Sequence, residues 1–178
     1  MDTKTIGNLV FEPFLEAKTI ASAVKEMAER LEELNLENPI FLVVLNGASV
    51  FASDLIRNYS KPMELEFIRL KSYSGTESLG QVSTLVGLDL SIEGRDIVVV
   101  EDIVDTGTTW GYLKDYLTEF KPQSISLATF LHKPEKQVIG DSPDLSCFRI
   151  KDEFVVGYGL DYDGLGRNWK DLYTLKNK

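Results

Sequence analysis

A group of acidic and small polar residues near the middle of the chain could do chemistry on a phosphorylated compound. Glu101, Asp102 and Asp105 are carboxylates that lie close together in the sequence. They are followed by four small residues that offer hydroxyl groups or free amide protons, Thr106, Gly107, Thr108 and Thr109. Carboxylates beside a phosphate site suit a reaction in which Mg²⁺ screens the phosphate charge, or in which one carboxylate accepts a proton.

A buried strand and a helix are predicted on either side of these residues. The run 97–100 is uniformly apolar, which is typical of a parallel strand covered on both faces. After the small polar loop, apolar side chains recur at helical spacing, at Trp110, Leu113, Leu117 and Phe120. Amide protons converge where a loop opens a helix, and the helix dipole adds partial positive charge. We therefore predict that residues 106–109 form a phosphate-binding cup.

Residues 98–109, VVVEDIVDTGTT, resemble the 5-phosphoribosyl pyrophosphate (PRPP) motif of type I phosphoribosyltransferases. A Glu-Asp pair followed by Asp-Thr-Gly is more specific than a lone glycine pattern. A Rossmann-like strand end with an acidic N-cap would explain Asp105 and Thr106 but not Glu101 together with Asp102. An aspartic-protease dyad would need a second Asp-Thr-Gly in a β-rich fold, and the sequence has none.

The resemblance implies a role for each residue of this motif. Asp105 is the expected catalytic proton acceptor. The 5′-phosphate of PRPP is expected to bind at Asp105, Thr106, Gly107, Thr108 and Thr109. Mg²⁺ is the expected cofactor, and the residues expected to hold or orient it are Glu101, Asp102 and Asp161.

A short loop is expected to bind the pyrophosphate group of PRPP. Asn46-Gly47 follows the apolar run 40–45, which we predict to be a central parallel strand. On backbone grounds alone Asn-Gly is simply a tight turn. In the hypoxanthine-using branch of the family the matching loop contacts pyrophosphate through main-chain amides, commonly contains a non-proline cis peptide, and often carries Lys or Arg where this chain has Asn46.

Two further segments are expected at the pyrophosphate. Residues 71–80 are polar and rich in Gly and Ser, and composition alone favours a long hairpin connection. Ser72 and Tyr73 nevertheless resemble the start of the family's lid, which closes over the pyrophosphate and keeps water from the reacting carbon. Arg167 matches a cation that binds pyrophosphate, although Gly164-Leu165-Gly166 differs from the bulkier residues of many members.

A base pocket is expected from the last third of the chain. Lys133 follows a predicted strand, and a lysine at a strand end is usually just solvated. In its Lys-Pro context the resemblance implies that Lys133 donates a hydrogen bond to the 6-oxo group of a purine. A 6-amino group could not accept that hydrogen bond. Residues 152–162 resemble the family's purine-binding segment. There Phe154, a core residue by type, is expected to stack on the base. Val155 is expected to bond the polar edge of the base, and Asp161 to lie near metal, pyrophosphate and purine.

We predict an α/β fold with a central, mostly parallel sheet flanked by helices, the type I phosphoribosyltransferase fold, and a small hood built from terminal segments. Hydrophobic periodicity predicts a helix at about 17–35. Further strands are predicted at 63–70, 81–86 and 125–131. We expect one domain, 1–178, in which residues from about 133 to 178 contribute the base-binding hood.

Composition limits the classes of function. The chain of 178 residues is 43% hydrophobic and 26% charged, which suits one globular domain. Its net charge of −9 argues against nucleic-acid binding. The single cysteine, Cys147, and single histidine, His132, leave oxygen as the expected metal donor. No run reaches the roughly 18 to 20 apolar residues that span a bilayer, and the start of the chain lacks a signal pattern, so we expect a cytoplasmic protein without membrane association.

The expected reaction is transfer of a 5-phosphoribosyl group from PRPP to N9 of hypoxanthine or guanine, which gives the nucleotide and pyrophosphate. The expected ligands are therefore PRPP and 6-oxopurine bases, and the family suggests a homodimer or homotetramer. Two alternatives stay open. One is a transferase that prefers xanthine, and the other is a regulator of the same fold that senses PRPP and binds nucleic acid.

Overall fold

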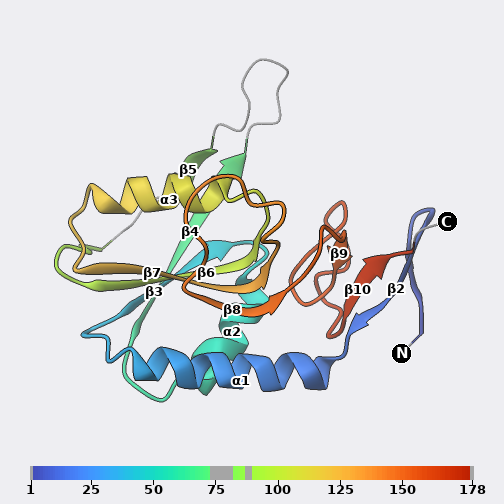
Figure 1. The fold of residues 1–178 in the computed structure, drawn as a ribbon, viewed down its shortest axis with the longest axis horizontal. Helices are drawn as coiled ribbons and strands as arrows, with labels where there is room; N and C mark the ends of the chain where they lie inside the picture. Colours follow the sequence, from blue (N-terminus) through green and yellow to red (C-terminus); the bar gives the residue numbers. More distant parts are fainter. Residues whose placement is uncertain (1, 73–81, 87–89, 177–178) are drawn as a thin grey trace.

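The computed structural model describes residues 2–72, 82–86 and 90–176. A large sheet with helices on both faces forms the body of the molecule, and a small sheet lies at one end (Figure 1). The predicted α/β class is confirmed by this arrangement. No helix in the described ranges is long and apolar enough to cross a membrane.

The large sheet has the order β5-β4-β3-β6-β7-β8. Its strands are β3 (Ile40–Leu45), β4 (Glu64–Ser72), β5 (Val82–Val86), β6 (Asp96–Val104), β7 (Ser124–His132) and β8 (Leu145–Arg149). All neighbouring strands are parallel except β5, which runs antiparallel to β4. Because β3 and β6 are central, both need apolar side chains on each face, which explains their unbroken apolar runs.

The helices cover the two faces of the sheet. They are α1 (Ala17–Glu33), α2 (Ser49–Asn58) and α3 (Thr108–Thr118), with α3 on the face opposite to α1 and α2 (Figure 1). Alternate residues of one strand serve opposite cores: Phe41 packs in the cluster that includes α1 and α2, whereas Leu42 packs in the cluster that includes α3. The expected helix ends agree within two residues, except that Phe120 lies beyond α3 and is exposed.

The small sheet confirms the predicted hood of terminal segments. Its order is β1-β2-β10-β9, all antiparallel, from β1 (Lys4–Ile6), β2 (Leu9–Leu15), β9 (Val155–Val156) and β10 (Leu172–Leu175). Ile6, Phe11, Val156 and Tyr173 form its buried core. The hood therefore joins both ends of the chain. The expectation that residues from about 133 onwards contribute a base-binding hood stays a prediction.

One boundary differs from the sequence expectation in a way that matters for the site. Glu101 and Asp102 do not follow the central strand but belong to it, because β6 continues to Val104. The strand continues because β7 pairs with it through the match of Val104 with His132. The pair is thus fixed to the sheet, and the loop begins at Asp105.

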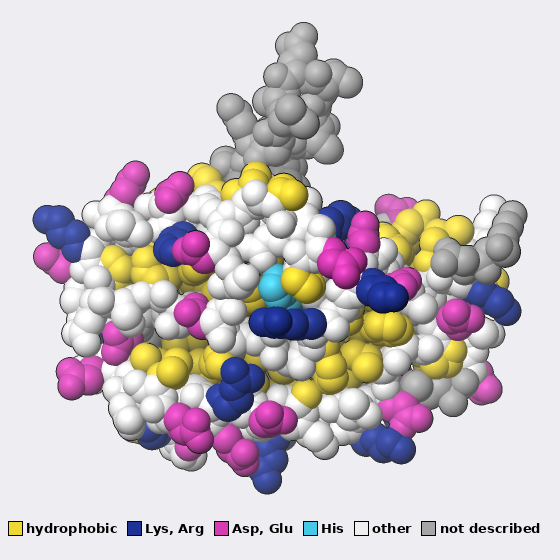
Figure 2. Space-filling view, viewed as in Figure 1, with side chains coloured by type: hydrophobic (Ala, Val, Ile, Leu, Met, Phe, Trp, Pro, Cys, Tyr) yellow, Lys and Arg dark blue, Asp and Glu magenta, His cyan; other side chains and the backbone are white. Residues whose placement is uncertain are grey.

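Acidic and basic side chains are interspersed over one broad face of the molecule (Figure 2). With a net charge of −9, the protein offers little electrostatic attraction to a polyphosphate backbone. Recognition of a phosphate group would therefore depend on local donors such as amides and hydroxyls.

Candidate active site

A cavity of about 330 Å³ lies at the carboxyl ends of β3 and β6. Ligands of open parallel sheets collect at this edge. The predicted residues that line the cavity are Gly47, Glu101, Asp102, Asp105, Thr106, Gly107, Thr108, Thr109, Asp161 and Arg167. Motifs that are far apart in the sequence therefore meet at one place.

The predicted phosphate cup is the N-terminal end of α3. Gly107 is the N-cap with a φ of +84°, and α3 begins at Thr108. The Thr106 and Thr108 hydroxyl oxygens are 2.9 Å apart. A Cβ atom on Gly107 would lie 1.9 Å from the carbonyl oxygen of Ile139. Glycine is therefore required both by the backbone angle and by the chain that packs over the loop.

The carboxylates at the end of β6 are held in an environment that disfavours their charge. Glu101 is 4% exposed, and its burial, together with repulsion from Asp102, raises its pKa well above the ordinary value. Burial raises the pKa of Asp102 to about 6, against the opposing effect of the Ile103 amide, which donates to Asp102 Oδ1 at 2.9 Å. A bound cation would reverse this preference by stabilising the ionised forms.

The short loop after β3 approaches Asp102 closely. A Cβ atom on Gly47 would lie 1.5 Å from Asp102 Oδ2, so any larger residue would require the Asp102 carboxylate to move. The peptide bond between Leu45 and Asn46 is cis, and the Asn46 residue is exposed. Gly47 lines the cavity with Asp102, as the expected pyrophosphate site requires.

The other residues expected to bind pyrophosphate are Arg167, Ser72 and Tyr73. Arg167 donates to the Gly159 carbonyl at 2.7 Å and forms an ion pair with Asp161 Oδ1 at 2.6 Å. The second oxygen of Asp161 accepts from the Gly164 amide at 2.7 Å. Ser72 is the last residue of β4, and Tyr73 lies outside the described residues, as does the proposed lid beyond Ser72.

A second cavity, of about 240 Å³, adjoins the first. The two cavities share Asp102, Ile103, Asp105 and Asp161 in their linings. The second is also lined by Lys133, Phe154 and Val155, the three residues predicted to bind the base. Residues of the predicted sugar-phosphate and base sites thus lie on opposite sides of a common wall.

Phe154 is not the core residue that its type alone would indicate. It is 47% exposed because it precedes the two-residue strand β9 and lies at the pocket, where it faces the rings of Phe11 and Tyr162 at centroid distances of 6.4 and 5.8 Å. Val155, by contrast, is buried in β9. An exposed aromatic ring beside an open pocket is suited to stacking on a flat ligand.

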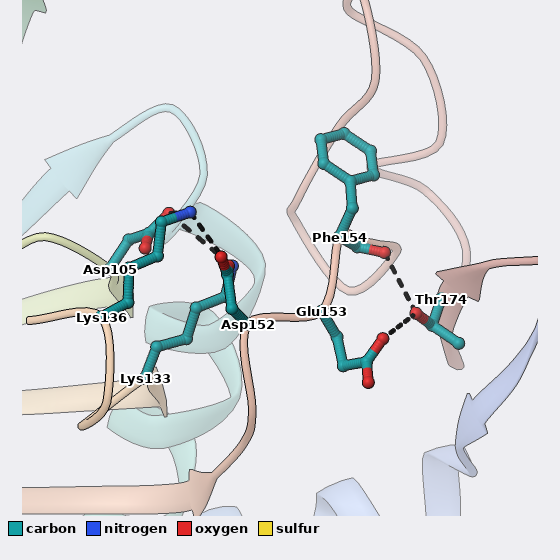
Figure 3. A network of polar contacts seen from close by, with 7 residues as sticks. All are labelled: Asp105, Lys133, Lys136, Asp152, Glu153, Phe154 and Thr174. Carbon is teal, nitrogen blue, oxygen red and sulfur yellow. Dashed lines mark hydrogen bonds and ion pairs between the residues drawn. The ribbon is translucent and has the colours of Figure 1, made fainter. Parts of the chain in front are cut away.

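Lys133 is not a solvated strand-end lysine. It is 5% exposed, and its Nζ atom lies 2.9 Å from Asp152 Oδ1 (Figure 3). Lys136 joins the same carboxylate. Sequence reasoning missed Lys136 and Asp152 as site residues; their only signal was their place beside Lys133 and Phe154 in the sequence.

Asp105 has two oxygens in different situations. Oδ2 faces Lys136 at 3.2 Å. Within the part of the chain that the structure describes, Oδ1 is buried and has no hydrogen-bond partner. A buried carboxylate oxygen without a partner is costly, so this atom is a strong candidate to meet a ligand.

The oxygen donors fit a magnesium ion that is shared with a substrate. Among residues 2–72, 82–86 and 90–176, no three Asp, Glu, His or Cys side chains form a group that could hold a metal ion by themselves. Glu101, Asp102 and Asp161 nevertheless line one cavity. Mg²⁺ commonly takes one or two carboxylates from the protein and completes its shell with water and substrate phosphates.

Comparison with known proteins agrees with this geometry. A family model described as the phosphoribosyl transferase domain matches residues 12–163. The hypoxanthine-guanine phosphoribosyltransferase of Streptococcus thermophilus is 38% identical over 161 residues, which cover 89% of each chain. That of Lactococcus lactis is 37% identical over 175 residues, which cover 97% of this chain and 95% of the relative.

Solved structures give the same result. A crystal structure of a hypoxanthine-guanine phosphoribosyltransferase from Bacillus anthracis matches with a TM-score of 0.87 and 35% identity, covering 92% of this chain and 97% of that one. A hypoxanthine phosphoribosyltransferase from Staphylococcus aureus also matches with a TM-score of 0.87, at 36% identity and with 93% and 91% coverage. The chain belongs to the type I phosphoribosyltransferase family, in its hypoxanthine-guanine branch.

Proposed function

We propose that the protein is a purine salvage enzyme that transfers the 5-phosphoribosyl group of PRPP to N9 of hypoxanthine or guanine. The observation that carries this proposal is the wall of residues common to the two cavities, which includes Asp102 and Asp105. A sugar held by its phosphate in the first cavity would present its anomeric carbon to a base in the second. Such positioning supplies much of the rate of a two-substrate reaction.

The 5′-phosphate is proposed to bind at the start of α3. The donors are the amides and hydroxyls of Asp105, Thr106, Gly107, Thr108 and Thr109. The position of Gly107 as N-cap supports this assignment, since the first amides of α3 have no partners within the helix. Fixing the phosphate there would hold the anomeric carbon toward the shared wall.

The pyrophosphate is proposed to lie against the loop Asn46-Gly47, with Ser72, Tyr73 and Arg167 as further contacts. Gly47 and Arg167 line the phosphate-side cavity, which supports their part of the proposal. The residues that would hold magnesium are Glu101, Asp102 and Asp161. Bound there, the ion would supply positive charge that neutralises the growing charge of the leaving pyrophosphate.

Asp105 is proposed as the proton acceptor. When N9 of the base bonds to the sugar, the purine ring becomes more acidic, and a carboxylate in reach of N7 can take or stabilise that proton. The buried and unpartnered Oδ1 of Asp105 supports this role. It faces no competing donor among the described residues, so a purine nitrogen could become its partner.

Base selection is proposed to rest on Lys133, Phe154, Val155 and Asp161. Lys133 would donate to the 6-oxo group, Phe154 would stack on the ring, and the main chain at Val155 would bond its polar edge. All four residues line the second cavity. Adenine offers an amino group where the ammonium needs an acceptor, so it should be rejected.

A substrate panel tests the proposal. In the presence of PRPP and Mg²⁺, the protein should release pyrophosphate with hypoxanthine or guanine and should not do so with adenine. The rate with xanthine tests the alternative that the protein is a transferase that prefers xanthine. Lys133→Ala should raise the KM for hypoxanthine at least tenfold, on the scale of a lost charged hydrogen bond, with a smaller change in the KM for PRPP. Release of pyrophosphate in an assay that contains adenine as its only base, or no base at all, would contradict the proposed specificity.

The same proposal includes a homodimer or homotetramer in the cytoplasm, with no nucleic-acid partner. Family membership supports the assembly, and the net charge of −9 speaks against nucleic acid. Light scattering coupled to gel filtration would give the oligomeric state. A gel-shift experiment at physiological salt would detect nucleic-acid binding, which the proposal does not expect.

A further inference from the structure

Two lysines and two aspartates form an ion-pair cluster at the wall of the base pocket (Figure 3). Lys133 and Lys136 follow β7, Asp105 follows β6, and Asp152 lies shortly before β9. Both lysine Nζ atoms lie 2.9 Å from Asp152 Oδ1. Both also face Asp105 Oδ2, from 3.7 Å for Lys133 and 3.2 Å for Lys136. Each lysine therefore meets the same two carboxylate oxygens.

This sharing matters because Lys133 has two competing tasks under the proposed function. Its side chain is only 6% exposed and is bound to carboxylates, yet it is proposed to donate to a neutral purine oxygen. Partly desolvated carboxylates hold an ammonium ion strongly unless another cation remains with them. Lys133 can turn toward a base at low cost only if Asp105 and Asp152 keep a positive partner.

We propose that Lys136 is a positioning residue for the base site. It stays with Asp105 and Asp152 and thereby releases the ammonium of Lys133 to the 6-oxo group of the purine. Lys136 can do this because it is bonded to both oxygens that Lys133 would leave. The count of charges supports the role: when Lys133 turns to the purine, Lys136 is the one lysine of this cluster that remains with the two carboxylates, and without Lys136 none would remain.

The same contact orients Asp105. Lys136 occupies the side of the carboxylate at Oδ2, and the opposite oxygen, Oδ1, is the buried atom for which no partner exists among the described residues. A carboxylate tethered by one oxygen keeps the other in a fixed direction. Lys136 would thus aim Oδ1 at the purine without touching the substrate, and loss of this effect would lower kcat rather than raise the KM for hypoxanthine.

An ordinary surface ion pair is the competing explanation. The Lys136 side chain is 37% exposed and that of Asp152 is 57% exposed, and exposed pairs contribute little to stability. On that view, removal of the Lys136 charge would lower stability slightly and would not change how the protein discriminates between bases. The two explanations therefore differ in a kinetic readout.

The experiment compares Lys136→Met, Lys136→Arg and the control Lys114→Met in the full-length protein. Lys114 also pairs with an aspartate, Asp141, but it lies in the middle of α3, and neither residue of this pair lines either cavity. At saturating PRPP, Lys136→Met should raise the KM for hypoxanthine about tenfold, the scale of coupling between neighbouring charges. The KM for PRPP should change less than about twofold, and kcat by a smaller factor than the KM for hypoxanthine. Lys136→Arg should restore most of the loss, and Lys114→Met should behave as the wild type.

A double-mutant cycle tests whether Lys136 acts through Lys133. In a Lys133→Met background, Lys136→Met should raise the KM for hypoxanthine by less than about twofold. The inhibition constant of unsubstituted purine, which lacks the 6-oxo group, should be unchanged by Lys136→Met alone. Additive effects, equal losses for purine and hypoxanthine, or a wild-type KM in Lys136→Met would each overturn this role. A wild-type protein that transfers no phosphoribosyl group to any base would overturn the proposed function, and this role with it.

Discussion

At the scale of single residues, the site depends on carboxylates that differ in how far their charge is already neutralised. Asp105 has one oxygen held by lysine and one oxygen without a partner. Glu101 is buried and Asp102 is half-buried near the end of β6, and desolvation raises the pKa of each, although Arg167 partly opposes this for Asp102. The first arrangement suits a proton acceptor, and the second suits residues that receive positive charge from a bound substrate complex.

Asp105→Asn tests the proton acceptor. An amide keeps the size of the side chain but cannot take a proton, so kcat should fall by about a hundredfold or more. The KM for PRPP should change much less, because the proposed phosphate donors are backbone amides, which the substitution keeps, and the hydroxyls of the threonines that follow. Steady-state kinetics with both substrates would show this, and an unchanged kcat at saturation would remove Asp105 from catalysis.

The pH dependence of stability tests the buried acids. Because the pKa of Asp102 is raised to about 6 in the folded protein, the folded state keeps a proton that the unfolded chain has lost between its ordinary pKa of about 4 and about 6. The free energy of unfolding of the metal-free protein should therefore fall as pH rises through this window. Asp102→Asn should flatten that fall, by on the order of 1 kcal/mol. Urea denaturation at a series of pH values measures it, and an unaltered slope would contradict the burial argument.

Residues of the contiguous motifs could be predicted individually, whereas partners across the site could not. Asp105, Thr106 and Gly107 follow one another, so their chemistry is visible in the sequence. Lys136 reaches Asp105 only because β6 and β7 are neighbours whose ends coincide, with Val104 beside His132. Phe154 looked like a core residue because its exposure depends on the hood rather than on its type.

At the scale of elements, the beginning of α3 combines a helix start with a close approach of another chain segment. The amides of Val138 and Ile139 both donate to the Thr106 carbonyl at 3.1 Å. Gly107 lies beneath this segment. The cup is therefore shaped by the segment after β7 as well as by α3 itself.

Gly107→Ala tests this arrangement, with Gly94→Ala as a matched control. Both glycines have positive φ values, +84° and +67°, but nothing lies within 4 Å of a Cβ atom on Gly94. Each variant should lose about 1 to 3 kcal/mol from the left-handed backbone angle. Only Gly107→Ala should also raise the Kd for PRPP, by about tenfold or more, because its methyl group displaces the Ile139 carbonyl. Equal PRPP binding in both variants would show that the packed segment does not shape the cup.

Long, uniform elements could be predicted, and short ones could not. The apolar runs of β3 and β6 and the periodicity of α1 are strong local signals. In the hood, β9 has two residues and β1 has three, too few for a pattern. Strand β2 contains Pro13 and alternates poorly, and it is stabilised by pairing with β10 at the other end of the chain.

At the scale of the whole molecule, the active site lies between a large parallel sheet and a small antiparallel hood. A hydrogen bond also joins the two parts, in addition to the chain segments that connect them. The Ala17 amide at the start of α1 donates to the Asp171 carboxylate beside β10 at 2.8 Å. Asp161 and Arg167 come from the segment between β9 and β10 and line the phosphate-side cavity. The hood therefore contributes to both proposed subsites.

The sequence could place the catalytic edge of the parallel sheet, because ligands gather at the carboxyl ends of its strands. The resemblance to a family supplied the hood of terminal segments, which local patterns did not indicate. Distances across the site required the structure, because they depend on how strands from distant parts of the chain align. Asp105 could therefore be predicted from its motif, whereas the contact of Lys136 with Asp105 could not.

A crystal structure of the protein with inosine 5′-monophosphate tests the central claim most directly. The account predicts that the phosphate lies against the amides at residues 106–109 and that the base lies beside Phe154 with its 6-oxo group toward Lys133. A nucleotide whose phosphate and base occupy these two cavities would agree with it. A base bound away from Lys133 and Phe154, or a phosphate bound away from the start of α3, would contradict it.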